Sequence, residues 1–438
     1  MKLTRDLLLR VEGEAILELE WEDGRVKDAR IILPSTRFIE KALIGRPVMD
    51  ALVIAPRVCG ICGHAHLMAS VKAIEDALFR VSLSNKAKVT RDITLMCEII
   101  QNHIKWFYLF VMPDILKFKQ IDKFTPFKGK RWIEAIRVSS LINKVIALFS
   151  GQWPHSSYAV PGGITSDFKD SELYKALALL SEVKTFFLDK TVELEEKEFK
   201  DLIKNGKPER VKGDLGLFLE VCEEHDLLTV GRAYNRFLTG GEIFPCVEPA
   251  HFTGSRKLCY MNLSCVKEVK CDDGYSKAYA VRYRDLPYET GPLSRQFLSG
   301  NLAVREMHRL YGDSYATRVF ARVLEIGVMC LNLEVKLNEL FTFLDEPSWI
   351  EPEVDLKNFS GEGASAVEAA RGTLIHKIQI EKGKIKNYTI ITPSQWNLGP
   401  RAGGFLGVAE KAVLNVKDSH IAQMIVRSFD MCSVCTTH

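Results

Sequence analysis

The chain has 438 residues, of which 47% are hydrophobic and 26% charged, and its formal net charge is only +3. This is the composition of a soluble globular protein with a large core. The charge balance excludes the strongly basic face that nucleic-acid binding usually needs. No apolar run is long enough to span a bilayer, and the N-terminus lacks the pattern of a signal peptide. We therefore expect a cytoplasmic protein whose 11 cysteines are free thiols or metal ligands rather than disulfides.

The secondary-structure pattern predicts two β-hairpins separated by helices. The stretch ILELEWEDGRVKDARIIL (16–33) alternates apolar and acidic residues and turns at Asp23-Gly24. The stretch LIHKIQIEKGKIKNYTII (374–391) turns at Lys382-Gly383. Between them, apolar residues recur at helical spacing, which predicts helices over 66–82, 87–112, 170–204 and 300–345. The charged stretch 193–214 indicates an exposed helix end and only a weak boundary. We expect one domain over residues 1–438, mainly α with small β-sheets (α+β).

Two cysteine pairs lie near opposite ends of the chain. RVCGICGHAH (57–66) contains Cys59, Cys62 and His66, and SFDMCSVCTTH (428–438) contains Cys432, Cys435 and His438. Each pair can give two thiolates to one metal, and the helix expected after the first pair favours thiolate over thiol.

A structural zinc site with four cysteines is one interpretation, although such pairs usually lie close together in sequence. A thioredoxin-like redox motif fits less well, because neither pair lies between a strand and a helix as that fold requires. Two independent sites would each be short of ligands.

An ordered set of motifs decides between these interpretations. Together with the two cysteine segments, the chain resembles the large, catalytic subunit of nickel–iron hydrogenases. The further matching motifs, in the family's order, are RVEGE (10–14), TRFIE (36–40), GQWPHSSYAVPGG (151–163), YETGPLSR (288–295), EAARG (368–372) and TPSQWNLGPR (392–401). A single Cys-x2-Cys means little, whereas this ordered set is highly specific. The resemblance implies the large-subunit fold, with a central bundle of long helices.

The resemblance also implies a binuclear metal centre. Cys59, Cys62, Cys432 and Cys435 would bind nickel, and Cys62 and Cys435 would also bind an iron that carries carbon monoxide and cyanide. Soft thiolates suit both metals. The implied activity is the reversible, heterolytic oxidation of H2 to protons and electrons.

Further residues of the matching motifs would serve this centre. Glu12 would carry protons, Arg371 would lie over the open side of the metals, and Asp430 would orient or pair with it. The residues expected around the metals are His66, as a donor to the Cys62 sulfur, Arg57, as a support of the pocket, and Pro393 and Ser394, which approach the diatomic ligands.

The family's pattern gives the terminal histidine a role of its own. His438, the Glu40 carboxylate and the backbone carbonyl of Ile390 would bind a magnesium (or iron) ion that holds the C-terminus inside the protein.

Electrons would leave through a partner, an iron–sulfur small subunit, because this chain lacks a convincing set of cluster ligands. Cys259, Cys265 and Cys271 are spaced by six, and we interpret them as buried or strand thiols. A hydrogen-sensing regulatory hydrogenase of the same fold is an alternative. A structural zinc-binding protein is a less favoured one. A respiratory complex I relative would lack the four cysteines.

The sequence departs from the family's pattern at a few positions. Met431 and Ala370 stand where proline is common, and Gln101-Asn102 stand where a carboxylate is usual. The metal ligands are unaffected, but proton handling or redox tuning is expected to differ.

Overall fold

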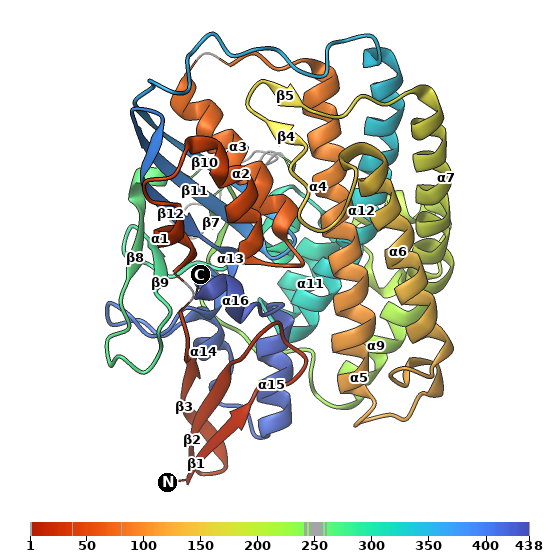
Figure 1. The fold of residues 1–438 in the computed structure, drawn as a ribbon. Coiled ribbons are helices and arrows are strands. Elements are labelled where there is room, and N and C mark those ends of the chain that lie inside the picture. Colours follow the sequence, from red (N-terminus) through yellow and green to blue (C-terminus); the bar gives the residue numbers. More distant parts are fainter. Residues whose placement is uncertain are drawn as a thin grey trace.

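The computed structural model describes residues 2–36, 38–79, 81–240, 243–244, 257–258 and 261–437. Its long helices stand side by side in one half of the molecule, and the two larger sheets and several short helices fill the other half (Figure 1). No helix in the described ranges is long and apolar enough to cross a membrane.

The long helices form the predicted bundle. They are α4 (Asn85–Lys105), α6 (Lys130–Ser150), α7 (Asp170–Phe186) and α12 (Tyr315–Leu340). Helix α4 packs against both α6 and α12, and α7 packs against the same two helices (Figure 1). Apolar residues at three- and four-residue spacing make their contacts; Ile93 and Ile100 of α4 and Phe320 of α12 are fully buried.

Two predicted helices are each divided in the structure. The stretch 170–204 forms α7, a π-helical turn over Phe187–Val192 and, after Glu193 with a φ of 51°, helix α8 (Glu196–Asn205). The stretch 300–345 forms α11 (Leu302–Tyr311) and α12. Gly312 has a φ of 71°, and the Ser314 side chain accepts a hydrogen bond from the Thr317 N–H, which starts α12. Apolar periodicity continues through both breaks, so it does not reveal them.

The remaining helices are shorter, and α3 is the longest of them. The predicted helix 66–82 is α3 (Gly63–Leu78), and the stretch 87–112 is α4 extended by a π-helical turn, Trp106–Val111. The others are α1 (Ile39–Leu43), α2 (Ala51–Ile54), α5 (Met112–Ile115), α9 (Gly213–Glu224), α10 (Pro292–Leu298), α13 (Pro393–Leu398), α14 (Val408–Ala412), α15 (Ser419–Ser428) and α16 (Ser433–Thr436).

The first sheet contains the predicted N-terminal hairpin. Strands β2 (Ile16–Glu22) and β3 (Arg25–Ile32) pair antiparallel, with positive φ at Asp23 (50°) and Gly24 (74°), as a tight hairpin turn requires. A further strand, β1 (Lys2–Leu7), pairs with β2 and was not predicted.

The second sheet contains the predicted C-terminal hairpin and one more strand. Strands β11 (Gly372–Glu381) and β12 (Lys384–Ile391) turn at Lys382-Gly383, and β10 (Gly361–Ala369) pairs antiparallel with β11. The chain reverses between β10 and β11 at Ala370-Arg371. The short strands elsewhere are β4 (Ala159–Val160), β5 (Gly163–Ile164), β6 (Phe237–Leu238), β7 (Lys257–Leu258), β8 (Val266–Val269) and β9 (Ala280–Tyr283).

Helix α3 lies directly on this second sheet, against β10 and β11. The approach is closest at Gly363 of β10, where an added Cβ would lie 2.2 Å from the Ala73 carbonyl oxygen and 2.3 Å from the Ala77 nitrogen. Backbone rather than a movable side chain fills that space. Glycine at this position therefore sets how close α3 and the sheet can be.

We predict that Gly363→Ala lowers stability, by about 1–3 kcal/mol as for other overpacked positions, because α3 must move away from β10. Calorimetry would show this as a lower Tm. Gly60→Ala is the matched control, since an added Cβ at Gly60 meets nothing within 4 Å. An equal Tm for the two variants would contradict this packing argument.

Candidate metal centre

The first cysteine pair lies between a turn and the start of α3. Cys59 follows the 3-10 turn Ala55–Val58, and Cys62 directly precedes Gly63, the first residue of the helix. An added Cβ at Gly63 would lie 2.8 Å from the Pro56 carbonyl oxygen, so this loop folds back tightly on itself. The loop is compact because glycine permits that approach, and it presents both sulfurs beside a helix N-terminus.

The second pair lies at the start of α16 and is held by the N-terminal segment. Glu12 forms a parallel bridge with Cys432, in which the Glu12 N–H donates to the Met431 carbonyl (3.3 Å) and the Ser433 N–H donates to the Glu12 carbonyl (2.8 Å). The Thr392 hydroxyl donates to the Cys435 carbonyl at 2.9 Å. Residues from both ends of the chain therefore position this loop.

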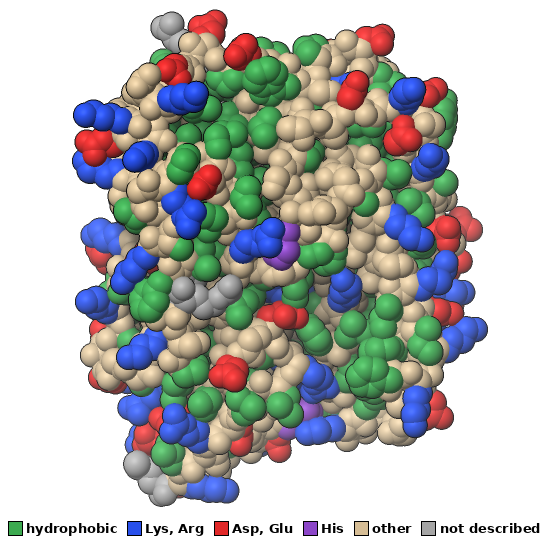
Figure 2. All heavy atoms as spheres, in the orientation of Figure 1, with side chains coloured by type: hydrophobic (Ala, Val, Ile, Leu, Met, Phe, Trp, Pro, Cys, Tyr) green, Lys and Arg blue, Asp and Glu red, His purple; other side chains and the backbone are tan. Residues whose placement is uncertain are grey.

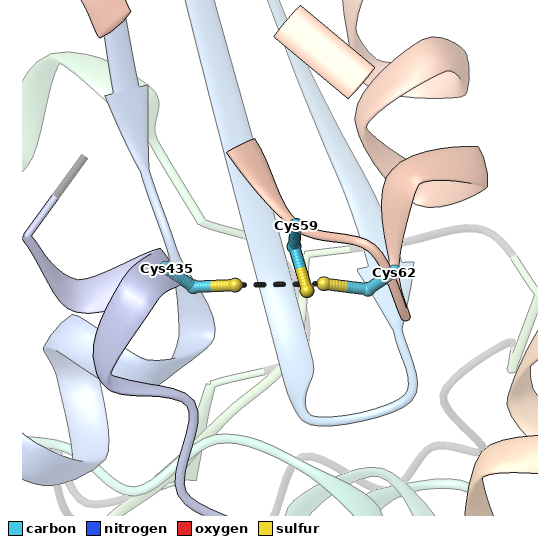
Figure 3. Close-up of side chains that lie close together, drawn as sticks. All are labelled: Cys59, Cys62 and Cys435. Atoms are coloured by element: carbon cyan, nitrogen blue, oxygen red, sulfur yellow. Dashed lines mark hydrogen bonds between the residues drawn. The ribbon is translucent and has the colours of Figure 1, made fainter. Parts of the chain in front are cut away.

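The four thiols converge in the interior. The sulfur–sulfur distances are 3.7 Å for Cys59–Cys432, 3.5 Å for Cys62–Cys435 and 2.8 Å for Cys432–Cys435. Figure 3 shows the Cys59, Cys62 and Cys435 side chains directed toward one another, and none of the four cysteines is more than 6% exposed. The neighbouring thiols, Cys432 first, hydrogen-bond to Cys59 and hold the pKa of its thiol well below the ordinary value. Such a buried set of sulfurs suits a soft metal.

Arg371 reaches this centre from the turn between β10 and β11. Its Nε donates to the Asp430 carbonyl at 2.8 Å and its Nη2 donates to the Asp430 carboxylate at 3.1 Å. Arg322 of α12 donates to the other carboxylate oxygen of Asp430 at 3.0 Å. Burial lowers the pKa of Arg371, but Asp430 and the cysteines outweigh it, so that its pKa lies well above the ordinary value. The structure thus brings Arg371 and Asp430 together and keeps a cation beside the thiols.

Two buried polar atoms near the cysteines lack protein partners among the described residues. They are Nη1 of Arg371 and the Ser394 hydroxyl, and each residue is 2% exposed. Ser394 lies in the first turn of α13, after Pro393 and Thr392, and Thr392 holds the Cys435 backbone. An unpaired buried donor indicates a missing acceptor. A cyanide ligand on iron would supply one, so these residues fit the group that the resemblance implies.

His66 was predicted to donate to the Cys62 sulfur, and the structure shows a contact with another histidine. His66 lies in α3, and its Nδ1 is 3.0 Å from Nε2 of His376, a residue of β11 that the sequence reasoning missed. His376 in turn contacts Tyr388 (2.8 Å) and Ser70 (3.2 Å). A hydrogen bond from His66 to the Cys62 sulfur stays a prediction. The apolar alternation Leu374, Ile378, Ile380 could have placed His376 on the buried face.

The other expected residues are distributed around the centre. The Glu12 side chain is half-buried; burial raises the pKa of its carboxyl, and Arg371 offsets part of that rise. Glu40 accepts a hydrogen bond from the Ile390 N–H at 2.5 Å, which brings those two parts of the predicted magnesium site together. His438 lies outside the described residues. The side chain of Arg57 is exposed, and its supporting role is still a prediction.

The evenly spaced cysteines do not lie deep in the core. Cys265 ends the turn before β8, Cys271 follows that strand, and both are half-buried free thiols. Cys259 lies outside the described residues. Within the described ranges, the only group of three or more side chains placed to hold a metal is that of Cys59, Cys62 and Cys435.

Comparison with known proteins agrees with this centre. The family model described as nickel-dependent hydrogenase matches residues 37–131 and 247–438. The periplasmic [NiFeSe] hydrogenase large subunit of Desulfomicrobium baculatum is 26% identical over 100% of this chain and 95% of its own length. The sulfhydrogenase 2 subunit alpha of Pyrococcus furiosus is 28% identical over 100% of this chain and 99% of its own length. A solved structure of the D. baculatum enzyme superimposes with a TM-score of 0.82 at 24% identity, covering 100% of both chains. The chain therefore belongs to the nickel-dependent hydrogenase family and has the large-subunit fold that its ordered motifs predicted.

Proposed function

We propose that this chain is the catalytic large subunit of a nickel–iron hydrogenase, which oxidises H2 reversibly to two protons and two electrons. The observation that carries this proposal is the convergence of four buried thiols, from opposite ends of the chain, beneath a buried arginine. A structural zinc would need the sulfurs but neither the arginine nor the unpaired Ser394 donor. The family assignment supports the same choice.

The residues divide the work as follows. Cys59, Cys62, Cys432 and Cys435 would hold nickel, with Cys62 and Cys435 also holding the iron and its carbon monoxide and cyanide ligands. The metals supply the site at which H2 is polarised and split. Arg371 places a fixed positive charge on the open side, and Asp430 fixes its direction. The Ser394 hydroxyl, which has no partner among the described residues, would donate to a cyanide ligand of the iron.

Proton transfer requires a base between the centre and solvent. Glu12 fits this role, because its backbone is tied to the Cys432 loop and its side chain is half-buried. The raised pKa of its carboxyl brings it closer to neutral pH, where a base can both accept and release protons. A second ion, magnesium or iron, would bind Glu40, the Ile390 carbonyl and His438; the burial of Thr436 and Thr437 supports a C-terminus held inside the protein.

Electrons must leave through another chain. The similar proteins named above are a large subunit and an alpha subunit of hydrogenases, and each such name implies a further subunit. We propose an iron–sulfur small subunit as the partner of this chain. Figure 2 views the molecule over α1, α2 and α16, and charged side chains gather mainly at the edge of that face. Exposed Phe38 directly precedes α1, and exposed Val53 lies in α2, close in sequence to the first cysteine pair. This face is the proposed docking surface. A cytoplasmic location is part of the proposal, and cell fractionation would test it.

A hydrogen sensor of the same fold is the second candidate. Gln101-Asn102 stand where the family usually has a carboxylate, which favours altered proton handling. This difference supports the sensor as a second candidate. Purification with the native partner, nickel, iron and zinc analysis, and H2-dependent dye reduction separate the candidates. A hydrogenase contains nickel and iron and turns over rapidly, a sensor contains both metals with little turnover, and zinc alone contradicts the proposal.

We predict that Arg371→Lys lowers the turnover of the complex by about 10²–10³, the loss typical for a positioned donor in an active site. Lysine keeps the charge but lacks the rigid planar fork with which Arg371 meets both the carbonyl and the carboxylate of Asp430. The test is dye reduction per bound nickel. Arg91→Lys is the control, because Arg91 is also buried and also donates two hydrogen bonds to one acidic residue, Glu75. Full turnover of Arg371→Lys would rule out the assigned role.

We predict that Glu12→Gln slows H2 oxidation by about 10²–10⁴, as for loss of a general acid–base group. The deprotonated carboxylate is the proton acceptor, so activity in the wild type should rise with pH through the pKa of Glu12, which lies above its ordinary value of 4.5. This acid-side dependence should disappear in the variant. Exposed Glu14→Gln is the control, and an unchanged pH–rate profile for Glu12→Gln would count against the proton path.

A further inference from the structure

One buried carboxylate next to the centre has no role in the proposal above. Glu98 of α4 is 0% exposed. Its oxygens accept hydrogen bonds from the His64 N–H (2.9 Å), the Ala65 N–H (2.9 Å) and the Trp153 indole N–H (3.2 Å). The two backbone bonds fix the first turn of α3 from the side of a neighbouring helix.

This turn is the one that follows the metal-binding cysteine. The first N–H groups of a helix have no partner inside it, and the side chain of Cys62, at the N-cap position, makes no capping hydrogen bond. Glu98 supplies the acceptors instead. Because Cys62 immediately precedes the turn, the position of the Glu98 carboxylate determines where the Cys62 backbone, and hence its sulfur, can lie.

The carboxylate also contributes charge. No lysine or arginine pairs with Glu98 in the described part of the chain; N–H donors alone stabilise its anionic form. Burial raises the pKa of Glu98 to about 7, backbone and indole donors oppose that rise, and Cys59 is near enough to add to it. Charge on Glu98 and charge on the Cys59 thiolate therefore influence each other.

We propose that Glu98 is a positioning residue of the metal centre, which holds the α3 turn behind Cys62 by accepting hydrogen bonds from its backbone. The inference rests on the proposed function, since it concerns the metals that these cysteines would bind. Glu98 acts through the His64 and Ala65 backbone and touches no metal. Residues that support metal ligands typically change metal affinity by about 10–100-fold when replaced.

The test variant is Glu98→Gln in the intact complex. Glutamine has nearly the same shape but is neutral, and its NH2 group replaces one of the two oxygens that accept from the His64 and Ala65 N–H groups. Infrared spectroscopy then reports electron density at the iron. A displaced Cys62 sulfur changes electron donation to the iron, so we expect the carbon monoxide band to move away from its wild-type position. Nickel per chain should also fall below that of the wild type.

Glu410→Gln is the matched control. Glu410 is also 0% exposed and accepts N–H groups of Ile31 (3.0 Å) and of Gly407 (2.9 Å), next to the start of another helix, α14, without touching the cysteines. It should lower Tm and leave the infrared bands and the nickel content unchanged. Wild-type bands and nickel content in Glu98→Gln would overturn the inference, and so would equal changes in both variants.

Two further outcomes have a defined meaning. If Glu98→Gln does not fold, Glu98→Asp keeps the charge but shortens the reach by one methylene. Reduced nickel content in Glu98→Asp, relative to Glu410→Gln, would then support the positioning role, and wild-type content would overturn it. A fully metallated wild type without carbon monoxide and cyanide bands would instead overturn the proposed function, and this inference with it.

Discussion

The structure depends on bringing four thiols together in the interior, where negative charge is costly unless it is compensated. Three pairs of these sulfurs lie 2.8–3.7 Å apart and would repel when deprotonated, and burial adds to the cost of each thiolate. A bound metal supplies most of the compensation. The protein adds the Arg371 guanidinium, a fixed cation beside the cysteines.

That cation is itself held by a chain of buried charges. The Asp430 carboxylate accepts hydrogen bonds from Arg371 and Arg322. The Glu325 carboxylate accepts from Arg295 and contacts His103. Removing one member of a buried ion pair typically costs about 3–5 kcal/mol, because the other charge loses its partner. Such a network constrains the arginine to one position. The same constraint explains why α12, a bundle helix, carries arginines and a glutamate among apolar residues.

Segments that are far apart in sequence hold the second cysteine pair in place. Glu12 pairs with Cys432 through the backbone, and Thr392 bonds to the carbonyl of Cys435. The short backbone bridge between Glu12 and Cys432 thus links the proposed proton path to the position of the Cys432 sulfur. Glu98 performs the corresponding task for the first cysteine pair, from a helix instead of a strand.

Local sequence patterns predicted the cysteine loops and the hairpins. They could not predict the contacts between segments that are far apart in sequence. The spacing within each cysteine pair, and the Asp-Gly and Lys-Gly turns of the hairpins, are local, so sequence alone revealed them. Strand β10 has the small-residue sequence GEGASAVEA, which shows no alternation because Gly363 must admit α3. The contacts of Arg322, His376 and Glu98 join segments far apart in sequence. Helical periodicity marks buried positions but cannot say which buried polar residue meets which, so these residues emerged only from the structure.

Infrared spectroscopy of the purified wild-type complex tests the central claim most directly, because no other proposed site in this chain would bind carbon monoxide and cyanide to a metal. The account predicts one carbon monoxide band and two cyanide bands from a sample that contains nickel and iron. A fully metallated sample without these bands would contradict it and would favour four-cysteine zinc.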